Sequence, residues 1–95
     1  MNATQNEWQK VSKGRITMEI SSFLGEHRGG FMIGYNQESQ IDDDEVPLAV
    51  GHALKTLEID IPVLPYKPRH GWKMSTLVGF IYENQLPKVK QETPL

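Results

Sequence analysis

The histidines are the residues best suited to acid–base catalysis or metal binding, and the chain has three of them, His27, His52 and His70. They lie 25 and 18 positions apart, so no two have the spacing of two or four residues that presents a pair of imidazoles on one strand or helix. We therefore predict no metal site and no cofactor. A catalytic His52 or His70 would need a carboxylate beside it in a pocket.

Nucleophilic catalysis has no recognisable basis in this sequence. The chain contains no cysteine, which excludes thiolate chemistry, disulfides and cysteine-containing zinc sites. No serine stands in the Gly-x-Ser-x-Gly sequence of a nucleophile elbow. We assign no catalytic residue and predict that the protein is not an enzyme.

The acidic run at residues 42–45 is the first of two candidate binding segments. It lacks the glycine and the alternating oxygen ligands of a calcium-binding loop. Acidic side chains are favourable at the positive end of a helix dipole, and a helical apolar pattern begins directly after this run. We predict that Asp43 or Asp44 caps a helix, and that the run also offers a partner-binding patch. The candidate residues are Asp42, Asp43, Asp44 and Glu45.

The second candidate is the basic-aromatic segment, residues 66–73, which reads YKPRHGWK. In a nucleic-acid site its bases would contact phosphates while an aromatic ring stacks on a base. The acidic remainder of the chain would repel a long polyanion, so a protein partner fits better. In a purely structural interpretation, Trp72 begins a core strand and the bases keep an exposed loop soluble. The candidate residues are Tyr66, Lys67, Arg69, His70, Trp72 and Lys73.

Composition favours a soluble protein. The 95 residues are 38% hydrophobic and 23% charged, with a formal net charge of −2. Acids predominate in residues 1–64 and bases in residues 65–95, a separation that is typical of solvated faces or of a partner surface. The polar N-terminus and the lack of any apolar run of about 18 residues predict a cytoplasmic protein that does not enter the membrane.

The elements that must position these side chains follow from hydrophobic periodicity. Apolar residues recur at three- and four-residue spacing over residues 44–58, which predicts a helix that has Pro47 in its first turn. Alternation over residues 15–24 and 31–36 predicts two strands, joined by a glycine-bounded loop with Glu26, His27 and Arg28 exposed at its tip. Residues 74–82 favour a strand, with a short helix capped by Ser75 as the open alternative.

These elements predict an α+β fold of order ββαβ, in which a small antiparallel sheet packs against one main helix. The sheet consists of the hairpin and the C-terminal strand. We predict one domain at residues 14–86, a flexible arm at residues 1–13 and a flexible tail at residues 87–95. The predicted core comprises Ile16, Met18, Ile20, Phe31, Ile33, Leu48, Leu54, Leu57, Val78 and Phe80.

The function that these features favour is a small non-enzymatic protein-binding module, such as an inhibitor, an adaptor or a regulatory subunit. It would act through loop and edge surfaces on another protein. A second copy of the chain is an alternative partner, since a domain of this size gains stability from oligomerisation. Nucleic-acid binding through residues 66–73 is the alternative function.

Overall fold

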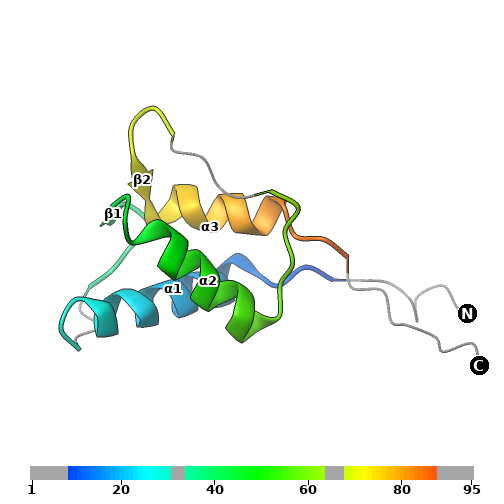
Figure 1. The fold of residues 1–95 in the computed structure, drawn as a ribbon, viewed down its shortest axis with the longest axis horizontal. Coiled ribbons are helices and arrows are strands. Elements are labelled where there is room, and N and C mark those ends of the chain that lie inside the picture. The colour runs from blue at the N-terminus through cyan, green and yellow to red at the C-terminus, as the bar shows by residue number, and fades with distance from the viewer. Residues whose placement is uncertain (1–8, 31–33, 64–67, 88–95) are drawn as a thin grey trace, which may run out of the picture.

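The computed structural model describes residues 9–30, 34–63 and 68–87. Within them the chain forms α1 (Lys13–His27), β1 (Gln40–Ile41), α2 (Val46–Leu57), β2 (Trp72–Lys73) and α3 (Met74–Glu83). Helix α1 packs against both α2 and α3, and α2 crosses in front of it in Figure 1. The predicted ββαβ order with one main helix is therefore wrong, because helices dominate the described part of the chain.

Helix α1 replaces the first predicted strand. The hydroxyl of Ser12 accepts a hydrogen bond from the backbone N–H of Arg15 at 3.2 Å and caps the helix. Every fourth residue from Ile16 onward is apolar and fully buried, at positions 16, 20 and 24. Arg28 is the C-cap of the helix, and Gly29 and Gly30 after it adopt positive φ angles of 127° and 90°.

The strand prediction failed here because two periodicities overlap. Ile16 and Ile20 satisfy both the alternation of a strand and the four-residue repeat of a helix. Met18 decides between them: its side chain is 67% exposed, since a residue two positions from Ile16 lies on the opposite side of a helix. The predicted core position at Met18 is thus wrong. Of the second predicted strand, residues 31–33 lie outside the described residues, and residues 34–36 are not in a strand.

Helix α2 confirms the predicted helix at residues 44–58, including Pro47 in its first turn. Its buried face comprises Val46, Ala49, Val50, Ala53 and Leu57. Glu58 ends the helix in the left-handed conformation, with φ 56° and ψ 49°. Neither Asp43 nor Asp44 is the N-cap; Glu45 takes that position without a side-chain capping bond. Leu48 is 52% exposed, so its assignment to the core is wrong.

Helix α3 replaces the predicted C-terminal strand, and the alternative of a short helix has the correct element type. Buried residues recur at helical spacing, namely Met74, Leu77, Val78 and Ile81. The N-cap is Lys73 and not Ser75. β-Branched and aromatic residues favoured a strand in this run, but burial of one helical face outweighs that local preference.

Strands β1 and β2 form an antiparallel pair that brings distant segments together. Ile41 is paired with Trp72, and Gln40 with Lys73. The pairing continues into the start of α3, where the N–H of Met74 donates to the Ser39 carbonyl at 2.8 Å. The acidic run after β1 is therefore held beside the loop that enters β2.

The core lies between the three helices and the strand pair. Of the predicted core residues, Ile16, Ile20, Leu57 and Val78 are buried, and Leu54 and Phe80 pack against the core while half-buried. Phe31 and Ile33 lie outside the described residues. The backbone N–H of Val11 donates to Gln85 Oε1, and Gln85 Nε2 donates to the Val11 carbonyl, both at 2.9 Å. The remainder of the predicted arm and tail, residues 1–8 and 88–95, is outside the described residues.

Candidate functional site

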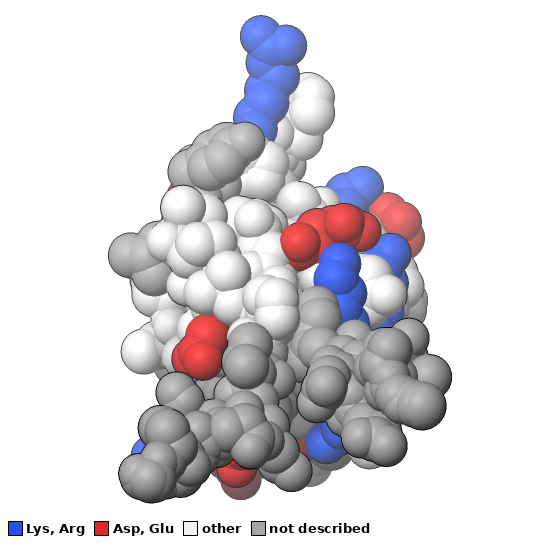
Figure 2. Space-filling view, turned by 90° about the vertical axis from the view of Figure 1, so that its right-hand side faces the viewer, with Lys and Arg blue, Asp and Glu red and all other residues white. Residues whose placement is uncertain are grey.

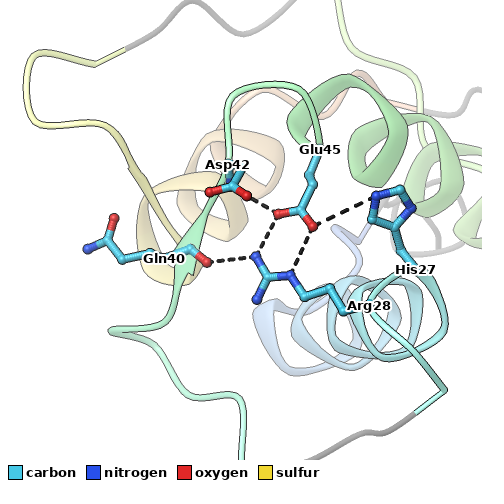
Figure 3. Close-up of polar contacts among 5 residues, drawn as sticks. All are labelled: His27, Arg28, Gln40, Asp42 and Glu45. Atoms are coloured by element: carbon cyan, nitrogen blue, oxygen red, sulfur yellow. Dashed lines mark hydrogen bonds and ion pairs between the residues drawn. The ribbon is translucent and has the colours of Figure 1, made fainter.

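The junction between α1 and α2 is held by Arg28 and Glu45 (Figure 3). The Arg28 guanidinium donates from Nε to Glu45 Oε2 at 2.9 Å and from Nη2 to Oε1 at 2.6 Å. Nη2 also donates to the Gln40 carbonyl at 3.0 Å, and the backbone N–H of Asp42 donates to Glu45 Oε1 at 3.0 Å. One arginine thus connects the end of α1, strand β1 and the start of α2.

This contact sets the ionisation of both groups. Hydrogen bonds from Arg28 lower the pKa of Glu45, and the Asp42 N–H and the nearby His27 lower it further. Burial of the carboxylate opposes these effects but does not outweigh them. The contact with Glu45 likewise raises the pKa of Arg28. Glu45 is only 4% exposed, so its carboxylate is committed to Arg28 and does not face a partner. Arg28, which the sequence places at an exposed loop tip, is a structural residue.

The other three acids of the run stay at the surface. Asp42, Asp43 and Asp44 are exposed and line a depression of about 460 Å³, which we call the acidic depression. Its remaining lining residues are Gln40, Ile41, Gly71 and Trp72. The strand pair therefore joins the acidic run to the basic-aromatic segment in one surface, although twenty residues separate them in the sequence.

Within the basic-aromatic segment, the described side chains differ in their availability. Arg69 and His70 are exposed. Lys73 is half-buried, and its Nζ lies 3.0 Å from Glu38 Oε1. Trp72 is only 4% exposed, so its ring is not free to stack on a base. The candidates Tyr66 and Lys67 lie outside the described residues.

Trp72 also lines a second depression. It has a volume of about 380 Å³, and we call it the apolar depression. Its lining residues are Val63, Pro68, Trp72, Thr76, Phe80 and Asn84, all of them uncharged. Trp72 packs edge-on against Phe80, with 6.4 Å between the ring centroids. Figure 2 views the molecule from the side where the segment after α2 passes, and a broad uncharged area covers much of that side.

None of the three histidines is among the described residues that line the two depressions. His52 Nε2 is 3.0 Å from Glu19 Oε1, across the contact between α2 and α1. The Phe23 ring lies between two of them, stacking on His27 at 5.2 Å and meeting His52 at 5.8 Å. His52 is thus an interface residue with a carboxylate beside it, and His70 is exposed. The described residues include no group of three or more histidine or acidic side chains placed to hold a metal ion.

No local pattern in the sequence indicates the contacts of Glu19 or Arg28. Both contacts connect α1 to α2, and α1 was predicted as a strand and a loop. Their partners are 33 and 17 residues away, too far for any local spacing rule to pair them.

None of the helices in the described residues has the length and apolar character that a membrane span requires. Comparisons of the chain with protein-family models, with curated proteins and with solved structures gave no match.

Proposed function

We propose that this chain is a small non-enzymatic protein-binding module, of the inhibitor, adaptor or regulatory-subunit type. The observation that carries the proposal is the acidic depression, where Asp42, Asp43 and Asp44 adjoin Gly71 and Trp72 of the basic-aromatic segment. A recessed surface that places exposed charges beside a largely buried aromatic side chain supports recognition of a protein segment.

Charge supports a protein partner over a nucleic acid. Two bases near this surface are engaged, since Arg28 binds Glu45 and Lys73 contacts Glu38, which leaves Arg69 and His70 exposed in the described part of the segment. Asp42 and Asp44, exposed beside the segment, would repel a phosphate backbone, which needs several uncompensated bases. The burial of Trp72 also removes an aromatic platform that single-strand binding would use.

Affinity capture with a matched pair of variants tests the proposal. The full chain, tagged, is incubated with a lysate of the cells that express it, and native mass spectrometry reports stoichiometry. We expect one protein to be retained by the wild type and by Asp60→Asn, whose exposed carboxylate lies outside the acidic depression. The doubly substituted Asp42→Asn, Asp44→Asn chain should lose it.

Two results would contradict the proposal. The first is the absence of any stoichiometric protein in the wild-type capture. The second is binding of labelled single- or double-stranded oligonucleotides, measured by fluorescence anisotropy, that weakens steeply with salt. That second result would assign the chain to nucleic-acid binding.

A further inference from the structure

We infer that the acidic and apolar depressions form one bipartite docking site for a peptide segment of a partner protein, in which an apolar side chain lies a few residues from a lysine or arginine. The inference rests on the proposed function and specifies the chemistry of the partner. Trp72 carries it, because this residue lines both depressions and so makes them neighbours.

The apolar half has the size and lining of a side-chain pocket. Thr76 and Phe80 lie four residues apart on one face of α3, and the C-cap residue Asn84 follows at the same spacing. Val63 and Pro68 complete the lining together with Trp72. Val63 is 54% exposed, so its side chain is accessible at this surface. The volume of about 380 Å³ is at the lower end of the range for ligand pockets, about 300–1,000 Å³, and suits a side chain more than a cofactor.

The acidic half determines the charge of the occupant. Asp42 and Asp44 are exposed, and their carboxylates form no ion pair with any described residue. Lys73, on the neighbouring strand, is already paired with Glu38, so it does not neutralise Asp42 or Asp44. A surface of this kind attracts a cationic side chain and disfavours an acidic one.

Trp72, which lines both halves, has a hydrogen-bond donor in its indole N–H. Its indole makes no hydrogen bond to any described residue, although the side chain is only 4% exposed. A buried indole N–H normally has an acceptor. A peptide that passes from one depression to the other runs along Trp72, and we assign one of its backbone carbonyls as that acceptor.

Selection from a random peptide display library, with the full-length chain as bait, tests this inference. We expect enriched peptides to combine an apolar residue with a nearby lysine or arginine. A synthetic, fluorescein-labelled copy of the most enriched peptide should bind about tenfold more weakly to Asp42→Asn, Asp44→Asn, and should lose most of its salt dependence with that variant.

Matched variants separate the apolar half from a general effect on the fold. Val63→Ser should weaken the same peptide about fivefold, whereas Leu48→Ser should leave it unchanged, since Leu48 is similarly exposed at 52% but lies outside both depressions. Circular dichroism must show that each variant is as folded as the wild type. Substitution of the peptide's basic residue by glutamate should abolish binding.

Several outcomes would overturn the inference while leaving the proposed function intact. These are enriched peptides without basic residues, binding that neither variant weakens, or no enrichment while lysate capture still retains a protein. A dimer in native mass spectrometry that Val63→Ser dissociates would assign the site to a second copy of the chain instead. If capture also retains no protein, the proposed function fails as well.

Discussion

Arg28, which ends α1, holds both carboxylate oxygens of Glu45, which precedes α2, at 2.9 and 2.6 Å. The same guanidinium reaches the carbonyl of Gln40 in β1. A planar fork of donors suits this arrangement, because it can meet a carboxylate at two points and still reach a third acceptor. The turn that carries the exposed aspartates is therefore fixed from its buried side.

Loss of the Glu45 charge should weaken this junction. Glu45→Gln keeps the shape of the side chain but weakens the contact between the buried Glu45 carboxylate and the partly exposed Arg28, so we expect the free energy of unfolding to fall by about 1–3 kcal/mol. Urea denaturation followed by circular dichroism measures the change. Glu26→Gln, at an exposed position of α1, is the control and should stay within about 0.5 kcal/mol of the wild type. Equal effects of the two substitutions would show that the contact contributes little.

The lowered pKa of Glu45 predicts how stability depends on pH. In the unfolded chain Glu45 has an ordinary glutamate pKa of about 4.3. Its carboxylate therefore takes up a proton at a higher pH in the unfolded chain than in the folded protein. The stabilisation is present above that unfolded pKa and is lost as the pH falls through the lower folded pKa. Urea midpoints recorded from neutral to acidic pH should therefore fall more steeply for the wild type than for Glu45→Gln. Parallel curves would contradict this assignment.

Two substitutions in α1 distinguish the helix from the strand that alternation suggests. Ile20→Ala should destabilise the protein by about 2–5 kcal/mol, because Ile20 is fully buried between α1 and its neighbours. Met18→Ala should change stability by less than about 0.5 kcal/mol, because this side chain is 67% exposed. Chemical denaturation of both variants measures the difference. Similar large losses at the two positions would favour a strand with both side chains on one buried face.

Replacing a glycine in α2 or α3 by alanine should stabilise the protein, unlike the substitutions above. A Cβ added at Gly51 or Gly79 meets no atom within 4 Å, so each alanine substitution should stabilise the protein by about 0.5–1 kcal/mol. Gly30→Ala is the matched control, because Gly30 has a φ of 90° and alanine there should be destabilising. Thermal unfolding of the three variants measures these effects. Destabilisation by Gly51→Ala would show that the helix surface is covered by another segment.

Local sequence rules identified α2 because all of its signals agree. Apolar spacing, the proline in the first turn and the acids before it favour the same element. At α1 and α3 those rules gave strands, because Ile16 and Ile20 fit two periods and the run from Met74 to Tyr82 is rich in residues that favour sheets. Only the burial of one helical face, a property of the packed protein, decides between the two structures.

The candidate site was predictable in its parts and not in its arrangement. Asp42 to Asp44 and the segment around Trp72 each stand out by composition. Their adjacency depends on the pairing of Ile41 with Trp72, two strand residues that are 31 positions apart and have the whole of α2 between them. The commitment of Glu45 to Arg28 likewise follows from how α1 and α2 pack.

The indole N–H resonance of Trp72 tests the central claim most directly. It is measured in a ¹⁵N-correlated NMR titration of the full chain with the captured partner or the selected peptide, and Trp8→Phe assigns it, since the chain has only two tryptophans. We predict that this resonance moves during the titration together with the backbone amides of Asp42, Asp43 and Asp44. Saturating binding that leaves Trp72 and these aspartates unmoved would contradict a binding surface at the two depressions.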